Sequence, residues 1–469
     1  MIGKIISDRH MPIINRAIRF GFLLIACLAL FGPTLLTLPA QAASNFKLEI
    51  KELVTPSGIR FWFVADTSRP IVSLKMAWKG GAVSEAPAQG GITQLMAHLL
   101  DEGAGDLSAS EFQNALSAQG IRLSFSAGLE TVTGSLQFLT HQQKPALSLL
   151  KMALQQPRFD PEAVERMRVL QISQRKRALS DPDVLNNENW WRLAYGDHAY
   201  ARPISGTQKT IQTLTRDQLV ARHQAHIARD NLFIALVGHM QEDEAIASVD
   251  AVFSALPAHA QVTQIEKKPL SQATRVSDNK QNRTKLIYPT PQSDIIFGLE
   301  GIAYQDKDFF AAYVMNYILG GGGLSARLME EIREKRGLAY SVYSSLYELD
   351  ISPLWTGNMA SSPENADLAI ALLETEMQKM RQTPVSATEL ANAKAYLIGS
   401  YLFRFDSGEK IARQLLSMQL NGFDRDYPNQ RQARIEAVQA ADIQRVAQRI
   451  LTPEHLLISV LTPPAKETD

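Results

Sequence analysis

The sequence predicts an α+β protein built from two similar halves. A series of helix, glycine, alternating strand, turn, strand and amphipathic helix occurs around Gly120 and again around Gly337. Strands and helices come in runs rather than in regular β-α-β alternation, which favours antiparallel sheets with helices on one side. A polar stretch without periodicity, residues 256–284, separates the two series. We therefore expect halves at 43–255 and 285–469, joined by a linker.

The individual elements follow from local patterns. In the stretch "IRLSF", residues 121–125, apolar and polar side chains alternate with the period of a strand. The sequence Asp160-Pro161 provides a cap and a proline at the first position of a helix. In the second half, Ser386 and Glu389 have the spacing of a capping box. Each half is thus expected to continue from strands into long helices.

Residues 1–42 have the features of a secretory signal peptide. An apolar run covers residues 20–30, and Ala40 and Ala42 form an A-x-A cleavage site, so the mature chain is expected to begin near Ala43. The basic residues that precede the apolar run are Lys4, Arg9, Arg16 and Arg19. This pattern predicts a periplasmic protein that has no membrane segment after cleavage.

Two alternatives concern the same segment. It could remain as a membrane anchor, although Gly32 and Pro33 interrupt the apolar run. The stretch "LIAC" around Cys27 resembles a lipoprotein cleavage box, but cleavage there would leave an apolar stretch on the mature chain. Cys27 is the one cysteine of the sequence, so the mature chain is expected to have no disulfide and no thiol chemistry.

The charge composition argues against a nucleic-acid-binding protein. Lys and Arg together number 48, and so do Asp and Glu. A nucleic-acid binder needs a basic surface that displaces counterions. We therefore expect no nucleic-acid partner.

Two motifs point to a family. The most specific is "GGGGLSARLMEEIREKRGLAYSV", which begins at Gly320, and the other is the helix "GGITQLMAHLLDEG", which begins at Gly90. With these motifs the mature chain resembles the pitrilysin, or insulinase-type, family of inverted-motif zinc peptidases, in the short bacterial branch similar to mitochondrial processing peptidase. The resemblance implies that the two halves form a clam-shell around a chamber for peptides.

The resemblance also identifies a zinc site whose chemistry is missing. Active members carry H-x-x-E-H on the first-half helix, and a distant Glu is the third ligand. Here the first His corresponds to Gln94, the general base to Ala97 and the second His to His98. The third ligand falls at or next to Gln174, in a stretch without carboxylates. The sequence therefore predicts no metal site in this chain.

The remaining histidines have simpler interpretations. We expect His98 to be a buried, hydrogen-bonded helix residue. His223 and His226 have a spacing of i, i+3 that could hold a metal, but the family has no site there, and we expect them at the surface.

The second half retains two residues that active members use at the zinc site of the first half. Arg333 and Tyr340 match the family's Arg and Tyr, and a guanidinium and a phenol can hold the substrate and stabilise a developing oxyanion. Without the resemblance, Arg333 would belong to a solvated charge cluster and Tyr340 to a core strand.

The glycine run is the expected substrate-binding loop. It comprises Gly320, Gly321, Gly322 and Gly323. Glycines allow close approach of another backbone and movement, and the matching loop of the family lines the chamber. A phosphate-binding loop is excluded because no Lys-Ser/Thr follows.

Together these features predict a zinc-less subunit of a heterodimeric periplasmic metallopeptidase. It would be inactive alone and would supply Arg333 and Tyr340 in trans to a homologous H-x-x-E-H partner, which carries the zinc. The substrate would be a peptide or unfolded polypeptide. One alternative is a catalytically silent structural or peptide-binding scaffold of the same fold, and another is a self-sufficient peptidase with an unrecognised site.

Overall fold

The structure is a computed structural model that describes residues 47–263, 270, 282–350 and 352–465. These residues belong to one unit of the chain, Lys47–Asp469, and the other unit is Met1–Phe46. The predicted signal peptide, with Cys27, therefore lies outside the described residues. So does most of the predicted linker, because residues 264–269 and 271–281 are not described.

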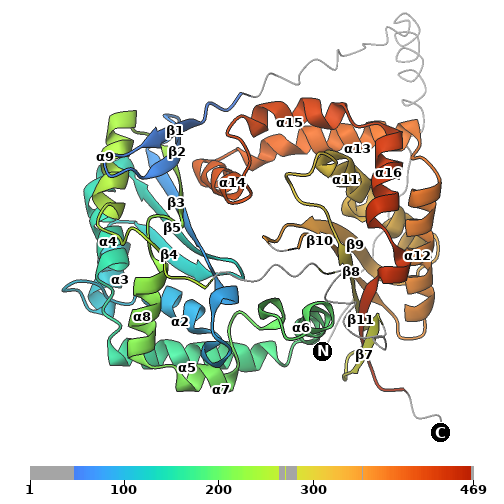
Figure 1. The fold of residues 1–469 in the computed structure, drawn as a ribbon, viewed down its shortest axis with the longest axis horizontal. Coiled ribbons are helices and arrows are strands. Elements are labelled where there is room, and N and C mark those ends of the chain that lie inside the picture. Colours follow the sequence, from blue (N-terminus) through green and yellow to red (C-terminus); the bar gives the residue numbers. More distant parts are fainter. Residues whose placement is uncertain (1–46, 264–269, 271–281, 351, 466–469) are drawn as a thin grey trace, which may run out of the picture. The chain divides into compact units, whose positions relative to one another are not determined.

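The first half contains a six-stranded sheet in the order β1-β2-β6-β3-β5-β4 (Figure 1). The strands are β1 (Lys51–Val54), β2 (Arg60–Ala65), β3 (Ile71–Lys79), β4 (Arg122–Ala127), β5 (Thr131–Leu139) and β6 (Leu232–Gly238). The centre of the sheet is the antiparallel pair β3 and β5, which runs from Ile71 opposite Leu139 to Lys79 opposite Thr131. The alternation predicted after Gly120 is that of β4.

The second half repeats this arrangement in a five-stranded sheet with the order β7-β11-β8-β10-β9. The strands are β7 (Arg283–Ile287), β8 (Ser293–Glu300), β9 (Ala339–Tyr347), β10 (Leu354–Ser361) and β11 (Leu457–Thr462). In chain order these strands take the places of β2, β3, β4, β5 and β6. The predicted α+β fold with two homologous halves is therefore confirmed.

The strand pairs are antiparallel as expected, except for one parallel pair in each sheet, which the sequence did not predict. β2 is parallel to β6, with Trp62 opposite Ala235, and β7 is parallel to β11, with Arg283 opposite Ile458. In both halves the last strand returns after several helices and lies beside the first strand. A connection of that length permits parallel pairing, which a short hairpin does not.

Helices follow the strands in both halves. Those of the first half are α2 (Ile92–Leu99), α3 (Ala109–Ala118), α4 (Gln143–Gln155), α5 (Pro161–Ala178), α6 (Pro182–Tyr195), α7 (Gln208–Thr213), α8 (Arg216–His226) and α9 (Glu242–Phe253). Those of the second half are α11 (Phe309–Asn316), α12 (Ala366–Gln382), α13 (Ala387–Gly399), α14 (Gly408–Leu420), α15 (Tyr427–Glu436) and α16 (Ala440–Ile450). Among the described residues, no helix is both long and apolar enough to cross a bilayer.

Shorter helical turns complete the chain. Two of them are π-helices, η5 (Tyr317–Gly321) and η7 (Met329–Glu334). The 3₁₀ turns are η1 (Ala82–Ser84), η2 (Pro87–Gln89), η3 (Thr140–Gln142), η4 (Ala199–Ala201), η6 (Gly323–Ser325), η8 (Ser400–Arg404) and η9 (Pro453–His455). The stretch that contains Arg333 is thus π-helical, whereas α3 at the corresponding place in the first half is an α-helix.

Both predicted helix starts are confirmed, with one difference. α13 begins with a complete capping box between Ser386 and Glu389. α5 begins at Pro161, but its N-cap Asp160 makes no capping bond and instead accepts from Arg158 Nε at 2.7 Å.

Each sheet is covered on one face by a helix from the other half (Figure 1). α6 packs on β8 and β11 of the second sheet, and α14 packs on β3 and β6 of the first sheet. Successive residues of a strand point to opposite faces, so Phe297 joins the core under the second half's own helices, whereas Ile296 packs with Trp190 of α6. The expectation of helices on one side only was therefore incomplete.

Specific contacts hold these exchanged helices. A Cβ on Gly298 would collide with the Trp190 ring, so only glycine lets α6 approach the sheet this closely. Asn186 Nδ2 of α6 donates to the buried Asp294 carboxylate at 2.8 Å. In the reciprocal contact, Lys75 Nζ of β3 donates to Glu409 Oε1 of α14 at 3.1 Å. The two halves are therefore joined by packing and by buried polar bonds.

Candidate functional site

The helix that corresponds to the zinc helix, α2, is firmly anchored at its N-terminus. The buried Glu85 carboxylate accepts the Gly91 and Thr93 N–H groups, each at 2.8 Å. Burial raises the pKa of Glu85, while these hydrogen bonds and the nearby Arg222 oppose the rise. Gly91 has φ +91°, and a Cβ there would collide with the Ser205 carbonyl oxygen. The N-terminus of α2 is thus held by Glu85, and each carboxylate oxygen of Glu85 already accepts a backbone N–H group.

The three motif positions of α2 offer little to a metal ion. Gln94 and His98 are half-buried, and burial lowers the pKa of the His98 imidazole. Ala97, at the place of the general base, is 0 % exposed and presents only a methyl group to the core. A neutral amide is a poor ligand for zinc, and a methyl group cannot accept a proton.

The third position lies on α5, which packs against α2. Gln174 is exposed, but its neighbour Arg175 is buried and forms a two-bond ion pair with Glu188 of α6, in which Nη2 lies 2.8 Å from Oε2. One turn earlier, the buried Gln171 donates to the Gly91 and Ser205 carbonyl oxygens at 3.0 and 2.9 Å. The inward face of α5 therefore carries an amide and a guanidinium where a carboxylate would be needed.

The donor set of the first half does not fit zinc. A guanidinium repels a cation, and one half-buried imidazole does not make a site. Within the ranges that the structure describes, no group of three or more His, Cys, Asp and Glu residues is arranged to hold a metal.

The expectation of surface histidines at the end of α8 was wrong. His226 is fully buried, and its pKa is lowered to about 3 by burial and by the nearby Arg222. His223 Nε2 lies 2.9 Å from the Leu154 carbonyl oxygen. This end of α8 is buried because the helix packs against α2, a contact that the spacing of the two histidines does not reveal.

The glycine run begins inside a tightly packed turn. Gly320 belongs to η5, and a Cβ there would lie 2.9 Å from Ser344 N and would collide with Ser344 Oγ. Ser344 Oγ and Trp355 Nε1 both donate to the buried Asn316 Oδ1, at 2.8 and 2.9 Å. Gly323 at the other end has φ +60° and open space around it. The loop is therefore fixed against β9 at one end and open at the other.

Arg333 and Tyr340 lie on neighbouring elements and both are exposed. Arg333 belongs to η7, its side chain is 43 % exposed, and its nearest carboxylate, Glu334, is 3.7 Å away. Tyr340 lies on β9, the edge strand that packs against η7, and is 64 % exposed. Among the described residues, no hydrogen bond involves the Arg333 guanidinium or the Tyr340 hydroxyl.

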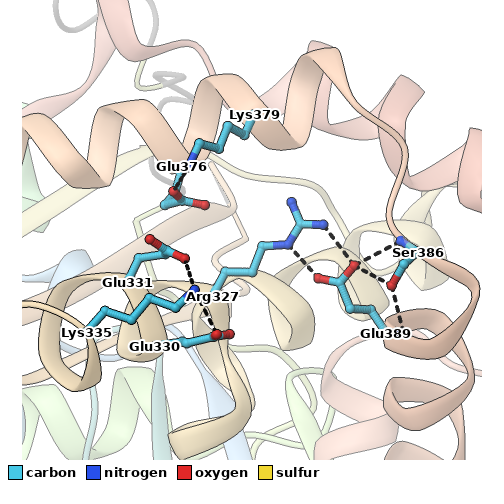
Figure 2. Close-up of polar contacts among 8 residues, drawn as sticks. All are labelled: Arg327, Glu330, Glu331, Lys335, Glu376, Lys379, Ser386 and Glu389. Atoms are coloured by element: carbon cyan, nitrogen blue, oxygen red, sulfur yellow. Dashed lines mark hydrogen bonds and ion pairs between the residues drawn. The ribbon is translucent and has the colours of Figure 1, made fainter.

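Four charged neighbours of Arg333 are paired with one another. Lys335 Nζ lies 2.6 Å from Glu331 and 2.9 Å from Glu330 (Figure 2). Arg336 Nη1 donates to Glu331 Oε2 at 2.7 Å. These bonds lower the pKa of Glu331 to about 2, with Lys335 as the largest cause. Arg333 is thus the one cation of the predicted charge cluster that has no carboxylate within 3 Å among the described residues.

Two family models match adjoining parts of the chain. The model described as insulinase, peptidase family M16, matches residues 60–208, and the model of the peptidase M16 inactive domain matches residues 213–397. The chain belongs to the M16 family. The inactive-domain match includes the glycine run, Arg333 and Tyr340, and the insulinase match includes the altered zinc motif.

Individual M16 relatives agree with this assignment. The chain is 24% identical over 389 residues to an uncharacterized zinc protease of Rickettsia bellii, covering 81% of this chain and 90% of the relative. It is 25% identical over 353 residues to the non-peptidase homolog YmxG of Helicobacter pylori, covering 75% and 78%. A crystal structure of a peptidase M16 inactive domain from Pseudomonas fluorescens superposes with a TM-score of 0.82 at 24% identity, covering 90% of this chain and all of that one. The fold and a zinc-less member of M16 are thereby supported.

Some residues around this M16 site could not be found from the sequence. The Arg175–Glu188 pair joins the consecutive helices α5 and α6, and the Arg327–Glu389 pair joins residues 62 positions apart. Glu389 was recognisable as a capping residue and Arg327 as part of the second-half motif, but no sequence signal connected them. Arg175 was within one residue of the expected position, and only its burial distinguishes it from Gln174.

Proposed function

We propose that this M16 chain is the zinc-less subunit of a heterodimeric periplasmic metallopeptidase. Its homologous partner would carry H-x-x-E-H and the zinc, and this chain would supply Arg333 and Tyr340 to the partner's site. The substrate would be a peptide or an unfolded polypeptide. In this proposal the chain is inactive alone and holds no cofactor of its own.

The observation that carries the proposal is the exposure of Arg333 and Tyr340, whose guanidinium and hydroxyl make no hydrogen bond to the residues that the structure describes. Glu330, Glu331, Lys335 and Arg336 form ion pairs with one another at 2.6–2.9 Å, whereas the one ion pair of Arg333, with Glu334, is 3.7 Å long. An Arg with a purely structural role would be expected to form one of the shorter pairs. The first half, by contrast, has lost the ligands and the base. A chain that keeps the substrate-holding groups and lacks the metal-holding groups needs the metal from another subunit.

The two side chains suit distinct tasks. The partner's zinc would polarise the substrate carbonyl and activate water. The Tyr340 hydroxyl can donate to the oxygen on which negative charge develops, and the Arg333 guanidinium can hold substrate carbonyl oxygens with its several donors. The glycine run, Gly320 to Gly323, would lie along the peptide, since its open end leaves backbone groups accessible.

The decisive experiment compares variants in the reconstituted complex. Tyr340→Phe and Arg333→Ala are each mixed with the H-x-x-E-H partner, and kcat is measured after gel filtration has shown that the complex forms. We expect each variant to lower kcat on the order of 10²–10³-fold, the usual loss for one such donor. Tyr343→Phe, an exposed tyrosine of the same strand, and Arg177→Ala of α5 serve as controls and should leave kcat unchanged.

Wild-type kcat for both variants would contradict the proposal and would favour the alternative of a silent scaffold. Activity of this chain alone would also contradict the proposal and would point to an unrecognised site.

The periplasmic location is tested separately. N-terminal sequencing of the periplasmic fraction should find a chain that begins near Ala43, and an intact N-terminus in the cytoplasm would refute the proposed location.

The metal content gives a further check on the same proposal. After dialysis, this chain should contain far less than one zinc per molecule, because Gln94, Ala97 and the Arg175 region do not fit the ion. The partner should retain about one zinc per chain. Elemental analysis that finds one tightly held zinc in this chain would overturn the proposal that only the partner carries the metal.

A further inference from the structure

The segment that carries Arg333 is tied to the rest of the second half by one ion pair. Arg327 Nε donates to Glu389 Oε1 at 2.7 Å, and Nη2 donates to Oε2 at 3.1 Å (Figure 2). Only 18 % of the Arg327 side chain is exposed. The pair joins the residue that lies just before η7 to the first turn of α13, 62 positions further along the chain. This two-bond geometry fixes the direction of the Arg327 side chain as well as its distance.

The carboxylate that receives Arg327 is itself held in place. Glu389 is the third residue of the α13 capping box, so its Oε2 also accepts the Ser386 N–H at 2.9 Å and the Ser386 hydroxyl at 2.8 Å. The pKa of Glu389 is lowered to about 2, chiefly by the hydrogen bond from Arg327 and further by the cap bonds from Ser386. The carboxylate therefore stays charged at physiological pH and cannot rotate without breaking the cap.

The η7 segment needs such an anchor. A π-helical turn is rare, occurs mostly as a single turn within a helix, and is frequently found at functional sites. Leu328 and Ile332 anchor the inner side of the segment in the core, while its outer side holds Arg333. The other described ion pairs of residues 326–338 join members of this segment to one another: Arg333–Glu334, Lys335–Glu330, Lys335–Glu331 and Arg336–Glu331. They do not tie it to another element.

We propose that Arg327 is a positioning residue, which together with Glu389 fixes the η7 segment so that Arg333 and, directly after it, Tyr340 are presented in a defined geometry. The inference rests on the proposed function, because the position of Arg333 and Tyr340 matters for turnover only if these two residues act on the substrate. Arg327 itself touches no substrate. Its removal would leave the donors in the chain but free to occupy several positions.

The test uses two variants that remove the ion pair and little else. Arg327→Met keeps most of the aliphatic stem, and Glu389→Gln keeps a carbonyl oxygen that can accept the capping bond. In the complex with the H-x-x-E-H partner, each should lower kcat about 10- to 100-fold, the scale expected for misplaced groups, with KM nearly unchanged. Arg283→Met is the matched control, because it removes the Arg283–Glu374 pair between β7 and α12 of the same half. Its kcat should equal that of the wild type.

A double-mutant cycle separates positioning from general stability. In an Arg333→Ala, Tyr340→Phe background, Arg327→Met should lower kcat less than twofold further, because the groups that it positions are already absent. A purely structural role would lower kcat by the same factor in both backgrounds, and this result would overturn the inference.

Hydrogen exchange of the isolated chain supplies a readout that does not need the partner. Arg327→Met should speed amide exchange in a peptide that covers residues 328–340 and leave the first half unchanged. Unchanged exchange together with unchanged kcat would refute the inference, and if Arg333→Ala lowers kcat in the same series the proposed function survives. Wild-type kcat for Arg333→Ala and Tyr340→Phe would instead overturn the proposed function and with it the catalytic purpose of the ion pair.

Discussion

The turns at Gly120 and Gly337 have the same backbone but present different side chains. Both glycines end a helical segment and precede an edge strand, with φ +62° and +63°. Four residues before the glycine the first half has Leu116, 4 % exposed, and the second half has Arg333. Three residues after it the first half has Leu123, 8 % exposed, and the second half has Tyr340.

This difference shows that corresponding positions of the two halves serve the core in one half and the surface in the other. In the first half, the places that correspond to the two donors are filled by apolar groups that stabilise the core, and the Glu85 carboxylate accepts hydrogen bonds from the N-terminus of α2. In the second half the corresponding side chains are exposed and make no hydrogen bond to the described residues. The wider π-helical turn of η7 accompanies this change, whereas α3 keeps regular α-helical geometry.

Exchanging these side chains should produce the largest effect. Leu116→Arg should reduce the free energy of unfolding by about 4 kcal/mol or more, because it forces an unpaired charge into the core. The reverse change, Arg333→Leu, should alter it by only about 0.5 kcal/mol, because the side chain is exposed and its ion pair with Glu334 is long and solvated. Urea unfolding of the two variants measures both values. Similar losses in the two variants would mean that the turns do not differ as described.

Alanine substitutions at Gly323 and Gly91 compare how tightly the surrounding atoms pack against the glycine loop and against the start of α2. Gly323→Ala should cost about 1–2 kcal/mol, the strain of a left-handed backbone with open space around it. Gly91→Ala has the same kind of strain and in addition places a methyl group against Ser205, so it should cost about 1–3 kcal/mol more. Thermal midpoints rank the two variants, and a Gly323 variant that is the less stable of the pair would contradict the comparison.

The pH dependence of two capping carboxylates should give the smallest effect, with opposite signs. The pKa of Glu389 is lowered to about 2, chiefly by Arg327, so its contribution to stability is present above about pH 4.5 and is lost as the pH falls towards 2. The pKa of Glu85 in the first half is raised by burial, so its contribution weakens as the pH rises above about 4.5.

The corresponding measurement is the thermal midpoint of Glu389→Gln and Glu85→Gln relative to the wild type from pH 2 to pH 7. The deficit of the Glu389 variant should shrink as the pH falls. The deficit of the Glu85 variant should shrink as the pH rises. Parallel curves for the two variants would show that both carboxylates share one environment.

Local patterns predicted the repeated parts of the fold well. The alternation after Gly120 identified β4, and the capping box at Ser386 identified the start of α13, because both signals depend on neighbours within a few residues. The exchange of α6 and α14 could not be predicted in the same way. The stretch "NWWRLAY" shows that α6 has apolar residues, but no local pattern states which sheet they cover.

The candidate site was predictable to a similar degree. The family motif placed Gln94, Ala97, Arg333 and Tyr340, and the structure adds which of them are buried and which are exposed. The π-helical turn of η7 was not foreseen, since its composition suits an α-helix equally well. The inward position of His226 and the ion pair of Arg327 depend on contacts between elements far apart in sequence, which sequence spacing does not contain.

The exchange of α6 and α14 also determines when the chain can finish folding. As residues 47–253 emerge during synthesis, α6 has no second sheet to pack on, and the outer face of β3 and β6 has no α14. Trp62 lacks α14 until the chain extends beyond residue 420, and Trp190 lacks β11 until the chain extends beyond residue 462. The first half therefore has an exposed apolar face while the second half is being synthesised, which is a hazard for aggregation. A fragment that ends in the linker should keep this apolar face exposed. Addition of a fragment that contains the second half should cover the face and complete the fold.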